Sequence, residues 1–188
     1  MIEKVIERKK IAQSEIVSLN RLTVELFDGR RAGRDVVSHP GGCVIIPVDD
    51  DNNVYFVKQY RIAFEAEIIE FPAGKLEIGE EPLSCAIREL REETGITAGS
   101  VKYVTCIYPS PGFCDEVLHV FFARDLVVQK ASPDDDEYVE VIKAPLSEGL
   151  NMLWDGRIRD AKTVMGILIA HWMTTNGDPL ATNPLTID

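Results

Sequence analysis

Long apolar runs are absent from this chain. No stretch approaches the ~20 consecutive apolar residues that a transmembrane helix requires. The N-terminal sequence, MIEKVIERKK, alternates charged residues with isolated apolar ones and lacks the apolar segment of a secretory signal peptide. These two absences argue against a membrane partner and predict a soluble protein of the cytoplasm.

An excess of basic residues is also missing. The 188 residues include 20 Lys and Arg against 31 Asp and Glu, which gives a formal net charge of −11 at pH 7. Because nucleic-acid binding requires a basic patch, the composition argues against a nucleic-acid partner. An anionic small-molecule substrate needs a bound cation and local arginines that reverse the sign of the charge at its site. Part of the acidic excess falls in residues 134–137, which we expect in a solvated loop.

The cysteines follow neither a redox pattern nor a metal-binding pattern. The chain contains Cys43, Cys85, Cys106 and Cys114, with no CxxC pair and no spacing typical of zinc sites. We therefore expect four reduced thiols, most of them buried as small apolar side chains.

The clearest chemical signal begins at Gly74, where the chain reads GKLEIGEEPLSCAIRELREETGI. Pro82 suits the first turn of a helix, and Gly95 suits the left-handed position that ends one. The sequence therefore predicts a helix from about residue 82 to residue 94. At helical spacing, one arc should pack on a core; it contains Leu83, Ala86, Ile87 and Leu90.

Three carboxylates fall on an adjacent arc of this helix. Glu92 and Glu93 come three and four residues after Glu89, which makes both of them its neighbours on the helix surface. Arg88 precedes Glu92 by four residues and can hold its carboxylate in one orientation. An ordinary solvated helix face is the alternative, but three crowded carboxylates repel one another. A hard divalent cation would relieve that repulsion, since Mg²⁺ commonly pairs a few carboxylates with substrate phosphates.

These residues resemble the Nudix box. Its fixed positions are all matched here, by Gly74, Glu80, Arg88, Glu89, Leu90, Glu92, Glu93, Gly95 and Ile96. The chain therefore resembles a family of hydrolases that use Mg²⁺ or Mn²⁺ to cleave a diphosphate linked to another group. The resemblance implies an α+β fold, in which an α/β/α sandwich surrounds a mixed sheet and the box forms a loop, a helix and a loop.

Segments outside the box resemble the ADP-ribose pyrophosphatase branch of that family. They are VKQYR at 57–61, EFPAG at 70–74, SPGFCDE at 110–116 and DAKT at 160–163. The resemblance implies hydrolysis of ADP-ribose, and of related ADP-sugars, to AMP and the sugar phosphate, which for ADP-ribose is ribose 5-phosphate. Hydrolysis of GDP-mannose or another nucleotide sugar is the first alternative. A module that senses a nucleotide without cutting it is the second, but such modules usually lose box carboxylates that this chain keeps.

The resemblance also implies the catalytic and metal-binding residues. Metal ligands would be the carbonyl of Ala73 with Glu89 and Glu93, while Glu92 would bridge two ions. Glu116 would orient or deprotonate the attacking water, with Glu92 as the alternative base. Arg88 would belong to the catalytic group through its hold on the box carboxylates.

Substrate contacts are implied at several further positions. Arg61 would contact the diphosphate or the terminal ribose, and Glu70 would be a further substrate-binding residue. Arg34 of a second subunit would lie against the adenine, although Arg30 and Arg31 could take the same part. Three loop residues complete the expected substrate site, namely Pro111, Gly112 and Phe113.

Three regions are expected along the chain. Residues 1–38 contain short strand patterns around an Asp28-Gly29 hairpin turn, a ribbon too small to be stable alone. In the branch that the chain resembles, this ribbon is exchanged between subunits, which implies a homodimer. Residues 39–175 form the Nudix domain and include a helix at 161–173, whose Val164, Ile167, Leu168 and Trp172 should be core. Residues 176–188 form a polar tail.

Overall fold

The computed structural model describes residues 2–129 and 138–177 of the chain, which form two compact units. One unit contains Met1–Gly41 and Tyr108–Leu118, and the other contains Gly42–Ile107 and His119–Asp188. We describe each unit by itself. The predicted acidic loop at 134–137 and most of the predicted tail lie outside the described residues.

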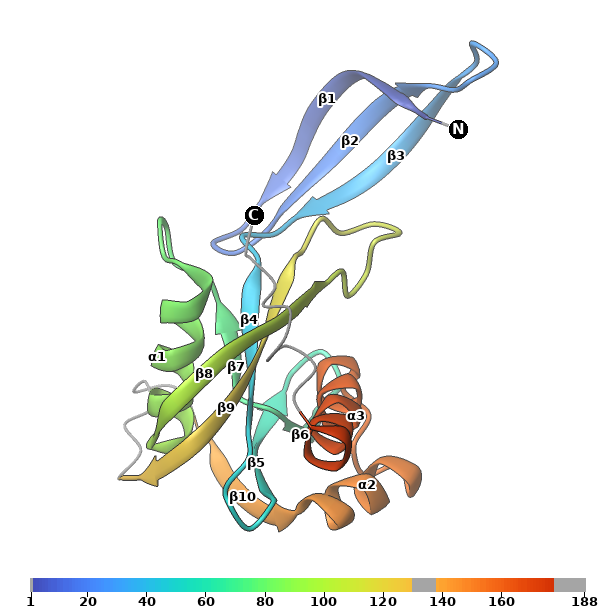
Figure 1. Ribbon diagram of the computed structural model, residues 1–188. Coiled ribbons are helices and arrows are strands. Elements are labelled where there is room, and N and C mark those ends of the chain that lie inside the picture. Colours follow the sequence, from blue (N-terminus) through green and yellow to red (C-terminus); the bar gives the residue numbers. More distant parts are fainter. Residues whose placement is uncertain (1, 130–137, 178–188) are drawn as a thin grey trace. The chain divides into compact units, whose positions relative to one another are not determined.

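The first unit contains an antiparallel sheet of three strands, β1 (Lys4–Gln13), β2 (Ser18–Glu25) and β3 (Arg31–Ser38), in that order (Figure 1). The predicted turn between the last two strands is present, with Gly29 at φ 82°. The carboxylate of Asp28 accepts a hydrogen bond from the backbone N–H of Arg30 at 3.1 Å. Strand β1 was not predicted, because all its side chains are exposed and no apolar face marks it.

A loop far along the chain is fastened to the end of β3 within this unit. The N–H of Val37 donates to the carbonyl of Phe113 at 2.7 Å, and the N–H of Asp115 donates to the carbonyl of Val37 at 3.1 Å. The side chain of Asp115 accepts from the N–H of His39 at 2.8 Å. Residues 113–115 are therefore held by backbone hydrogen bonds that span more than 70 positions of sequence.

The described residues of the second unit form two sheets and three helices. One sheet has the order β7 (Ala73–Lys75), β4 (Gly42–Pro47), β9 (Leu118–Val128) and β8 (Ile96–Ile107). The other has the order β10 (Glu140–Pro145), β5 (Asn53–Arg61) and β6 (Ala66–Glu70). The helices are α1 (Pro82–Thr94), α2 (Leu146–Trp154) and α3 (Ala161–Asn176).

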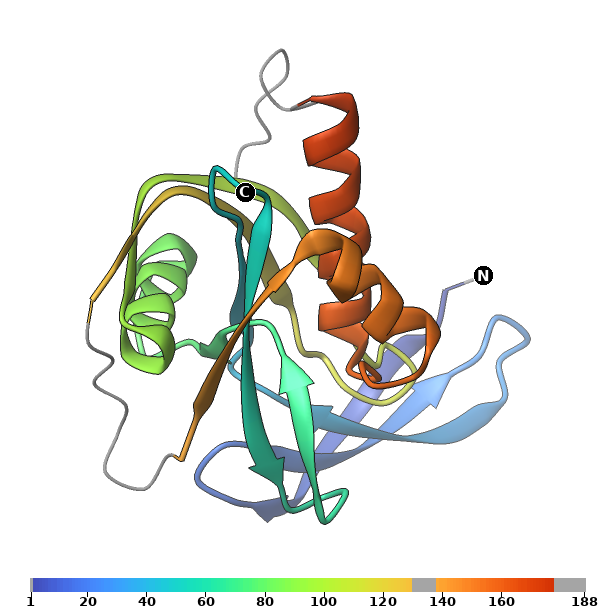
Figure 2. The same cartoon turned by 90° about the horizontal axis from the view of Figure 1, so that it is seen from below.

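Helices α1 and α3 cover opposite faces of the sheet that contains β4 (Figures 1 and 2). Ile45 of β4 belongs to a buried cluster with Ala86 and Leu90 of α1. The next residue, Ile46, lies against Gly166 of α3. Because successive strand residues point to opposite faces of a sheet, the two helices sandwich it. This arrangement confirms the predicted α+β sandwich.

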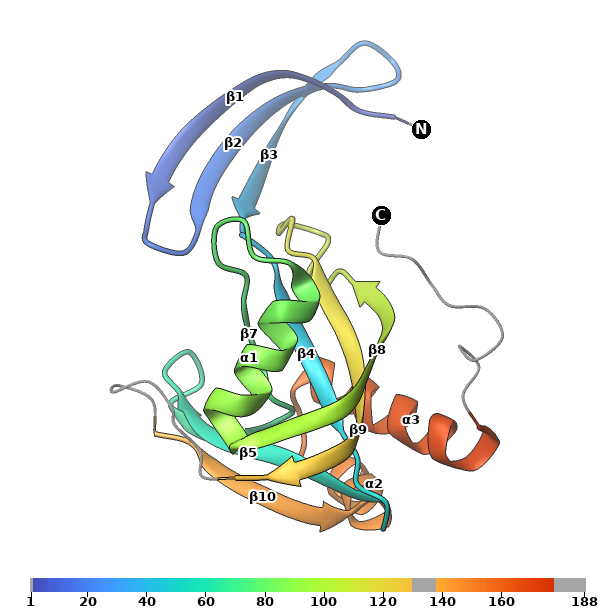
Figure 3. The same ribbon diagram turned by 60° about the vertical axis from the view of Figure 1, so that its left-hand side comes forward.

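Helix α1 begins and ends where the sequence predicted, but its buried face differs. The buried residues are Cys85, Ala86, Leu90, Glu93 and Thr94. Leu83 and Ile87, which we expected in the core, are about half exposed. The helix is rotated so that Glu93 faces the sheet, where its carboxylate meets the backbone (Figure 3 shows α1 over the strands). The hydrogen bond of Glu93 therefore accompanies a rotation of α1 about its axis that leaves Leu83 and Ile87 half exposed.

Helix α3 differs from its predicted core stripe in a similar way. Ile167 is fully buried as expected, whereas Leu168 and Trp172 are about half exposed. Gly166 lies so close to the ring of Phe71 that a Cβ atom there would approach it to 2.6 Å. Gly166 therefore allows α3 to pack directly on Phe71. In this orientation Leu168 and Trp172 are half exposed and lie outside the core.

Two cysteines that the sequence left unpaired are joined in the structure. Cys43 of β4 and Cys85 of α1 form a disulfide, while Cys106 and Cys114 are free. The prediction of four reduced thiols is therefore wrong for the first pair. The two residues are 42 positions apart and meet because α1 packs on β4, which no local spacing reveals.

No helix among the described residues is long and apolar enough to cross a membrane.

The turn between β4 and β5 is organised by one carboxylate. Asp49 accepts hydrogen bonds from the backbone N–H of Asn53 at 2.8 Å and from the hydroxyl of Tyr55 at 3.1 Å. Lys143 of β10 lies 2.8 Å from the same carboxylate. This ion pair ties the polar turn to β10.

Candidate functional site

The Nudix-like stretch forms a loop, a helix and a second loop within the second unit. Pro82 occupies the start of α1, and Gly95 ends it at φ 69° and ψ 11°, donating its N–H to the carbonyl of Arg91 at 2.9 Å. In the preceding loop, the N–H of Glu80 donates to the carbonyl of Glu77 at 3.0 Å. The loop is therefore a closed turn that brings Glu80 back toward the helix.

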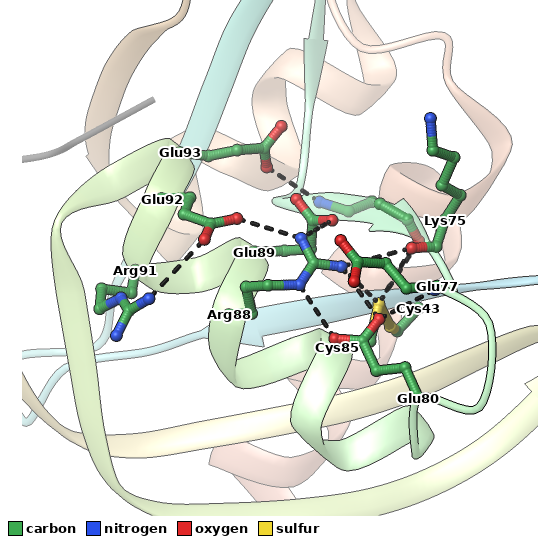
Figure 4. Close-up of polar contacts among 12 residues, drawn as sticks. Cys43, Lys75, Glu77, Glu80, Cys85, Arg88, Glu89, Arg91, Glu92 and Glu93 are labelled. Carbon is green, nitrogen blue, oxygen red and sulfur yellow. Dashed lines mark hydrogen bonds and ion pairs between the residues drawn. A yellow bond between two sulfur atoms is a disulfide. The ribbon is translucent and has the colours of Figure 1, made fainter. Parts of the chain in front are cut away.

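Arg88 lies at the centre of the box carboxylates (Figure 4). Its Nε and Nη2 atoms lie 2.9 and 3.1 Å from the two carboxylate oxygens of Glu80. Its Nη1 atom donates to Glu89 at 2.7 Å and to Glu92 at 3.0 Å. One guanidinium therefore orients three carboxylates, as planar arginine forks do.

These contacts shift the ionisation of the partners. Hydrogen bonding to Glu80 is the main reason that the pKa of Arg88 is raised above its ordinary value. The same hydrogen bond is the main reason that the pKa of Glu80 is lowered. The predicted pairing of Arg88 with Glu92 is present, but the bidentate pairing with Glu80, eight residues earlier, was missed. Only the closed loop before α1 makes that pairing possible.

Glu93 is directed toward the strand side of the site. Its side chain accepts a hydrogen bond from the backbone N–H of Ala73 at 3.0 Å, and the residue is only 4% exposed. The amide of Gln59 on β5 lies 3.5 Å from its other oxygen. The structure thus brings together Glu93 and Ala73, two of the predicted ligand positions.

Gly74 makes room for Glu89. A Cβ atom on Gly74 would lie 1.8 Å from a carboxylate oxygen of Glu89, so the carboxylate would have to move away. The backbone at Gly74 is not in the left-handed region, so the glycine serves here by allowing this close approach of the Glu89 carboxylate. Gly74 therefore leaves the space that the carboxylate of Glu89 occupies.

The donor chemistry of these residues fits a hard divalent cation. The carboxylates of Glu89, Glu92 and Glu93 and the carbonyl of Ala73 supply the oxygen atoms that such cations prefer. Within the part of the chain that the structure describes, no three His, Cys, Asp or Glu side chains converge as a ready metal site. Arg88 instead supplies the positive charge between Glu89 and Glu92. A cation would bind by drawing these carboxylates away from their present partners.

A second charged cluster contains the predicted substrate residues Arg61 and Glu70. The Nε and Nη2 atoms of Arg61 bind the two oxygens of Glu70 at 2.6 and 2.9 Å. Lys162 at the start of α3 also binds Glu70, and it lies 3.0 Å from Asp160. Hydrogen bonding to Glu70, with smaller contributions from the charges of Glu93 and Asp160, raises the pKa of Arg61. No role was predicted for Lys162, because Glu70 is 92 positions away in the sequence.

Arg34 lies in the first unit, on β3. It forms an ion pair with Glu3, with donor–acceptor distances of 3.1 and 2.5 Å. Arg30, one of the two alternatives, pairs with Asp28 at 2.7 Å. The structure therefore gives Arg34 an acidic partner, Glu3, within its own unit.

Glu116 lies on the loop that is fastened to β3. Its carboxylate is 3.7 Å from Nδ1 of His39, a neighbour that the sequence did not suggest. The same loop carries the other predicted contacts in a turn closed by hydrogen bonds from Phe113 and Cys114 to the carbonyl of Ser110, at 3.1 and 2.9 Å. Pro111, Gly112 and the half-exposed Phe113 form that turn. The expected base thus has a partly buried setting with limited freedom.

Comparison with known proteins gives concordant matches. A family model described as NUDIX domain matches residues 38–165. ADP-ribose pyrophosphatase of Bacillus subtilis is 42% identical over 167 residues, which are 88% of this chain and 90% of that protein. The methanol dehydrogenase activator of Bacillus methanolicus is 39% identical over 167 residues, with the same coverage. GDP-mannose pyrophosphatase of Klebsiella pneumoniae is 33% identical over 187 residues, 90% of this chain and 91% of that one.

A solved structure shows the same fold. The crystal structure of an ADP compounds hydrolase superposes with a TM-score of 0.81 at 20% identity, and the match covers 94% of this chain and 97% of that one. The family model spans more than half of the chain, and its range contains the complete box from Gly74 to Ile96. The chain therefore belongs to the Nudix family of hydrolases.

Proposed function

We propose that this protein is a divalent-metal-dependent pyrophosphatase that hydrolyses ADP-ribose, and related ADP-sugars, to AMP and the sugar phosphate. The single observation that carries the proposal is the intact box, in which Arg88 orients Glu80, Glu89 and Glu92 while Glu93 meets the backbone of Ala73. The branch is supported by the 42% identity to an ADP-ribose pyrophosphatase over most of both chains.

Glu89, Glu92, Glu93 and the carbonyl of Ala73 would hold the metal. Their donors are all oxygen atoms, which suits Mg²⁺ and, as the second choice, Mn²⁺. When bound, the metal neutralises charge on the diphosphate and lowers the pKa of a bound water. Arg88 orients Glu89 and Glu92 through hydrogen bonds, and Gly74 leaves the space that Glu89 needs.

Binding an anionic substrate requires positive charge close to the box. Arg61 supplies it, because its side chain is 41% exposed and its guanidinium interacts with the charge of Glu93. Glu70 holds one edge of that guanidinium, so it acts through Arg61. Hydrolysis of a phosphoanhydride depends mostly on such positioning and on charge neutralisation.

A proton acceptor completes the chemistry. Glu116 takes this role, since its loop is fixed by hydrogen bonds to Val37 and its carboxylate is only partly exposed. Glu92 is the alternative acceptor within the box. Pro111, Gly112 and Phe113, on the loop of Glu116, contact the substrate in this proposal.

The first three strands form the dimerisation element in this proposal, and Arg34 reaches the adenine of the partner's substrate. Such a small sheet gains stability by packing on another surface. The protein acts on a small molecule in the cytoplasm, as a homodimer without nucleic-acid or membrane partners. Residues 1–38 are the exchanged element, 39–175 the catalytic domain and 176–188 a tail.

Hydrolysis of GDP-mannose is the second candidate function. It is favoured by relatives of 30–33% identity that are named GDP-mannose pyrophosphatase and are matched over most of their length. The base is read by a small number of contacts, so a change of a few side chains is enough to change it.

A substrate panel tests the proposal. Purified protein with Mg²⁺ is given ADP-ribose, ADP-glucose, GDP-mannose and NADH, and phosphate is measured after coupling to a phosphatase. We expect the highest kcat/KM with ADP-ribose. Preference for GDP-mannose would support the second candidate and refute the choice of base. Tight binding without turnover of any compound would refute catalysis altogether.

A further inference from the structure

The first turn of α3 holds the end of β6 by two consecutive residues. Lys162 binds the carboxylate of Glu70, and the hydroxyl of Thr163 accepts a hydrogen bond from the N–H of Phe71 at 2.8 Å. Asp160 caps the helix, accepting from the N–H and the hydroxyl of Thr163 at 3.0 and 2.7 Å. The turn is therefore rigid, and it fixes both the side chain and the backbone at this point of the strand.

Glu70 is a buried carboxylate that shares two cations. Its side chain is 3% exposed, and Arg61 and Lys162 approach it from different elements, β5 and α3. Burial alone would raise the pKa of Glu70, but the hydrogen bonds from Arg61 and the charge of Lys162 lower it. A buried charge that loses one partner is strongly destabilised. Because Arg61 and Lys162 share the carboxylate of Glu70, the loss of either one changes how Glu70 binds the other.

The contacts of Arg61 show that its shared partner Glu70 sets the orientation of the guanidinium. Glu70 occupies the Nε and Nη2 atoms in a bidentate contact, which fixes the plane of the guanidinium. The remaining nitrogen, Nη1, is not used by Glu70 and lies on the other edge of that plane. Since Arg61 is 41% exposed, this edge is the one that can meet a phosphate oxygen.

Lys162 itself is poorly placed to touch a substrate. Its side chain is 16% exposed, and its ammonium group is bound by Glu70 and lies 3.0 Å from Asp160. We propose that Lys162 is a positioning residue that acts through Glu70 to hold Arg61 in the orientation that binds the diphosphate. The proposal rests on the proposed function of the site and adds a residue outside the box and outside the predicted substrate contacts.

Steady-state kinetics with ADP-ribose test this role. Lys162→Met should raise KM about tenfold, which corresponds to ~1.4 kcal/mol of coupling, and should change kcat much less. Lys162→Arg keeps the charge beside Glu70 and should recover most of the affinity. Lys143→Met is the matched control, because Lys143 also pairs with a carboxylate, that of Asp49 at 2.8 Å, and is bonded to neither Glu70 nor Arg61.

A double-mutant cycle separates positioning from a general structural effect. If Lys162 acts through Arg61, Lys162→Met should raise KM no further in an Arg61→Ala background. An equal rise in both backgrounds, or an unchanged KM in the single variant, would overturn the proposal. If Lys162→Met does not fold, Lys162→Gln, which keeps a hydrogen-bond donor without the charge, takes its place in the cycle.

A spectroscopic measurement tests the same idea without a substrate. The Nε–H of Arg61 donates to a buried carboxylate, so its ¹H–¹⁵N signal should be protected from exchange with water and can be assigned by its loss in Arg61→Lys. The signal should shift or broaden in Lys162→Met and persist in Lys162→Arg and Lys143→Met. An unchanged signal in Lys162→Met would refute the positioning role even if ADP-ribose proved not to be the substrate.

Discussion

The carboxylate of Glu89 lies directly over the backbone of Gly74, in the space that a side chain at position 74 would fill. The first residue of the box and a predicted metal ligand fifteen positions later are therefore one structural unit. Gly74 contributes by lacking a side chain, because the carboxylate of Glu89 occupies that space.

Gly74→Ala should remove most of the activity. A Cβ atom 1.8 Å from the carboxylate forces Glu89 to move, and a displacement of about 1 Å at a reacting centre can cost about a hundredfold in rate. The measurement is kcat/KM with Mg²⁺ and ADP-ribose. Gly33→Ala is the control, because its Cβ would meet only ordinary contacts with Arg21 at 3.6 Å or more. Activity close to wild type in Gly74→Ala would show that the position of the Glu89 carboxylate does not depend on the space at Gly74.

Glu93→Gln should lower kcat by about a hundredfold or more, in line with the loss of a metal ligand or its close support. The neutral amide keeps the shape of the side chain and can still accept from the N–H of Ala73, so the fold should survive. Activity is followed against Mg²⁺ concentration, with circular dichroism as the check on folding. Turnover near the wild-type level at low Mg²⁺ would exclude Glu93 from the metal site.

Glu116→Gln should lower kcat by about a hundredfold, the typical contribution of a general base, and should change KM less. The amide cannot accept a proton at neutral pH but fills the same space beside His39. Pre-steady-state and steady-state rates with ADP-ribose provide the measurement. Glu92→Gln is run in parallel, and an unchanged kcat in Glu116→Gln would assign the proton acceptor to Glu92.

Asp49→Asn should destabilise the protein by about 2 kcal/mol at neutral pH, since hydrogen bonds to a charged group are lost. Burial alone would raise the pKa of Asp49, but hydrogen bonds from Lys143, Asn53 and Tyr55 lower it to about 2, from an ordinary value of 3.8. A lowered pKa in the folded state gives stability that is present above pH 3.8 and is lost as the pH falls toward 2.

The difference in Tm between wild type and Asp49→Asn should therefore be constant above about pH 4 and shrink below it. Asp51→Asn serves as the control, because the carboxylate of Asp51 is exposed in the same turn. A difference in Tm that stays constant down to pH 2 would show that the charge of Asp49 contributes nothing.

Local sequence signals predicted the parts of the site that local structure builds. Pro82 and Gly95 gave both ends of α1, and the i, i+4 spacing of Arg88 and Glu92 gave one of its contacts. The Asp28-Gly29 signal gave the turn between β2 and β3. These features depend on residues a few positions apart, so the chain order alone determines them.

Other features depend on tertiary packing and could not be read from the sequence. The rotation of α1 that buries Glu93 is set by the backbone of Ala73, twenty positions earlier. Arg88 reaches Glu80 only because the loop between them closes. Lys162 meets Glu70 across 92 positions. In each case the partner is fixed by the fold, and propensity or periodicity carries no information about it.

The bonds between Val37 and the segment around Phe113 have a practical consequence for fragments of this protein. A truncated chain that begins at Gly42 would keep the whole box, from Gly74 to Ile96, but would lose the strand to which the segment next to Glu116 is tied. Such a fragment could retain cation affinity and still turn over slowly. Cation binding by a shortened chain would then report on the box alone and give no measure of its catalytic competence.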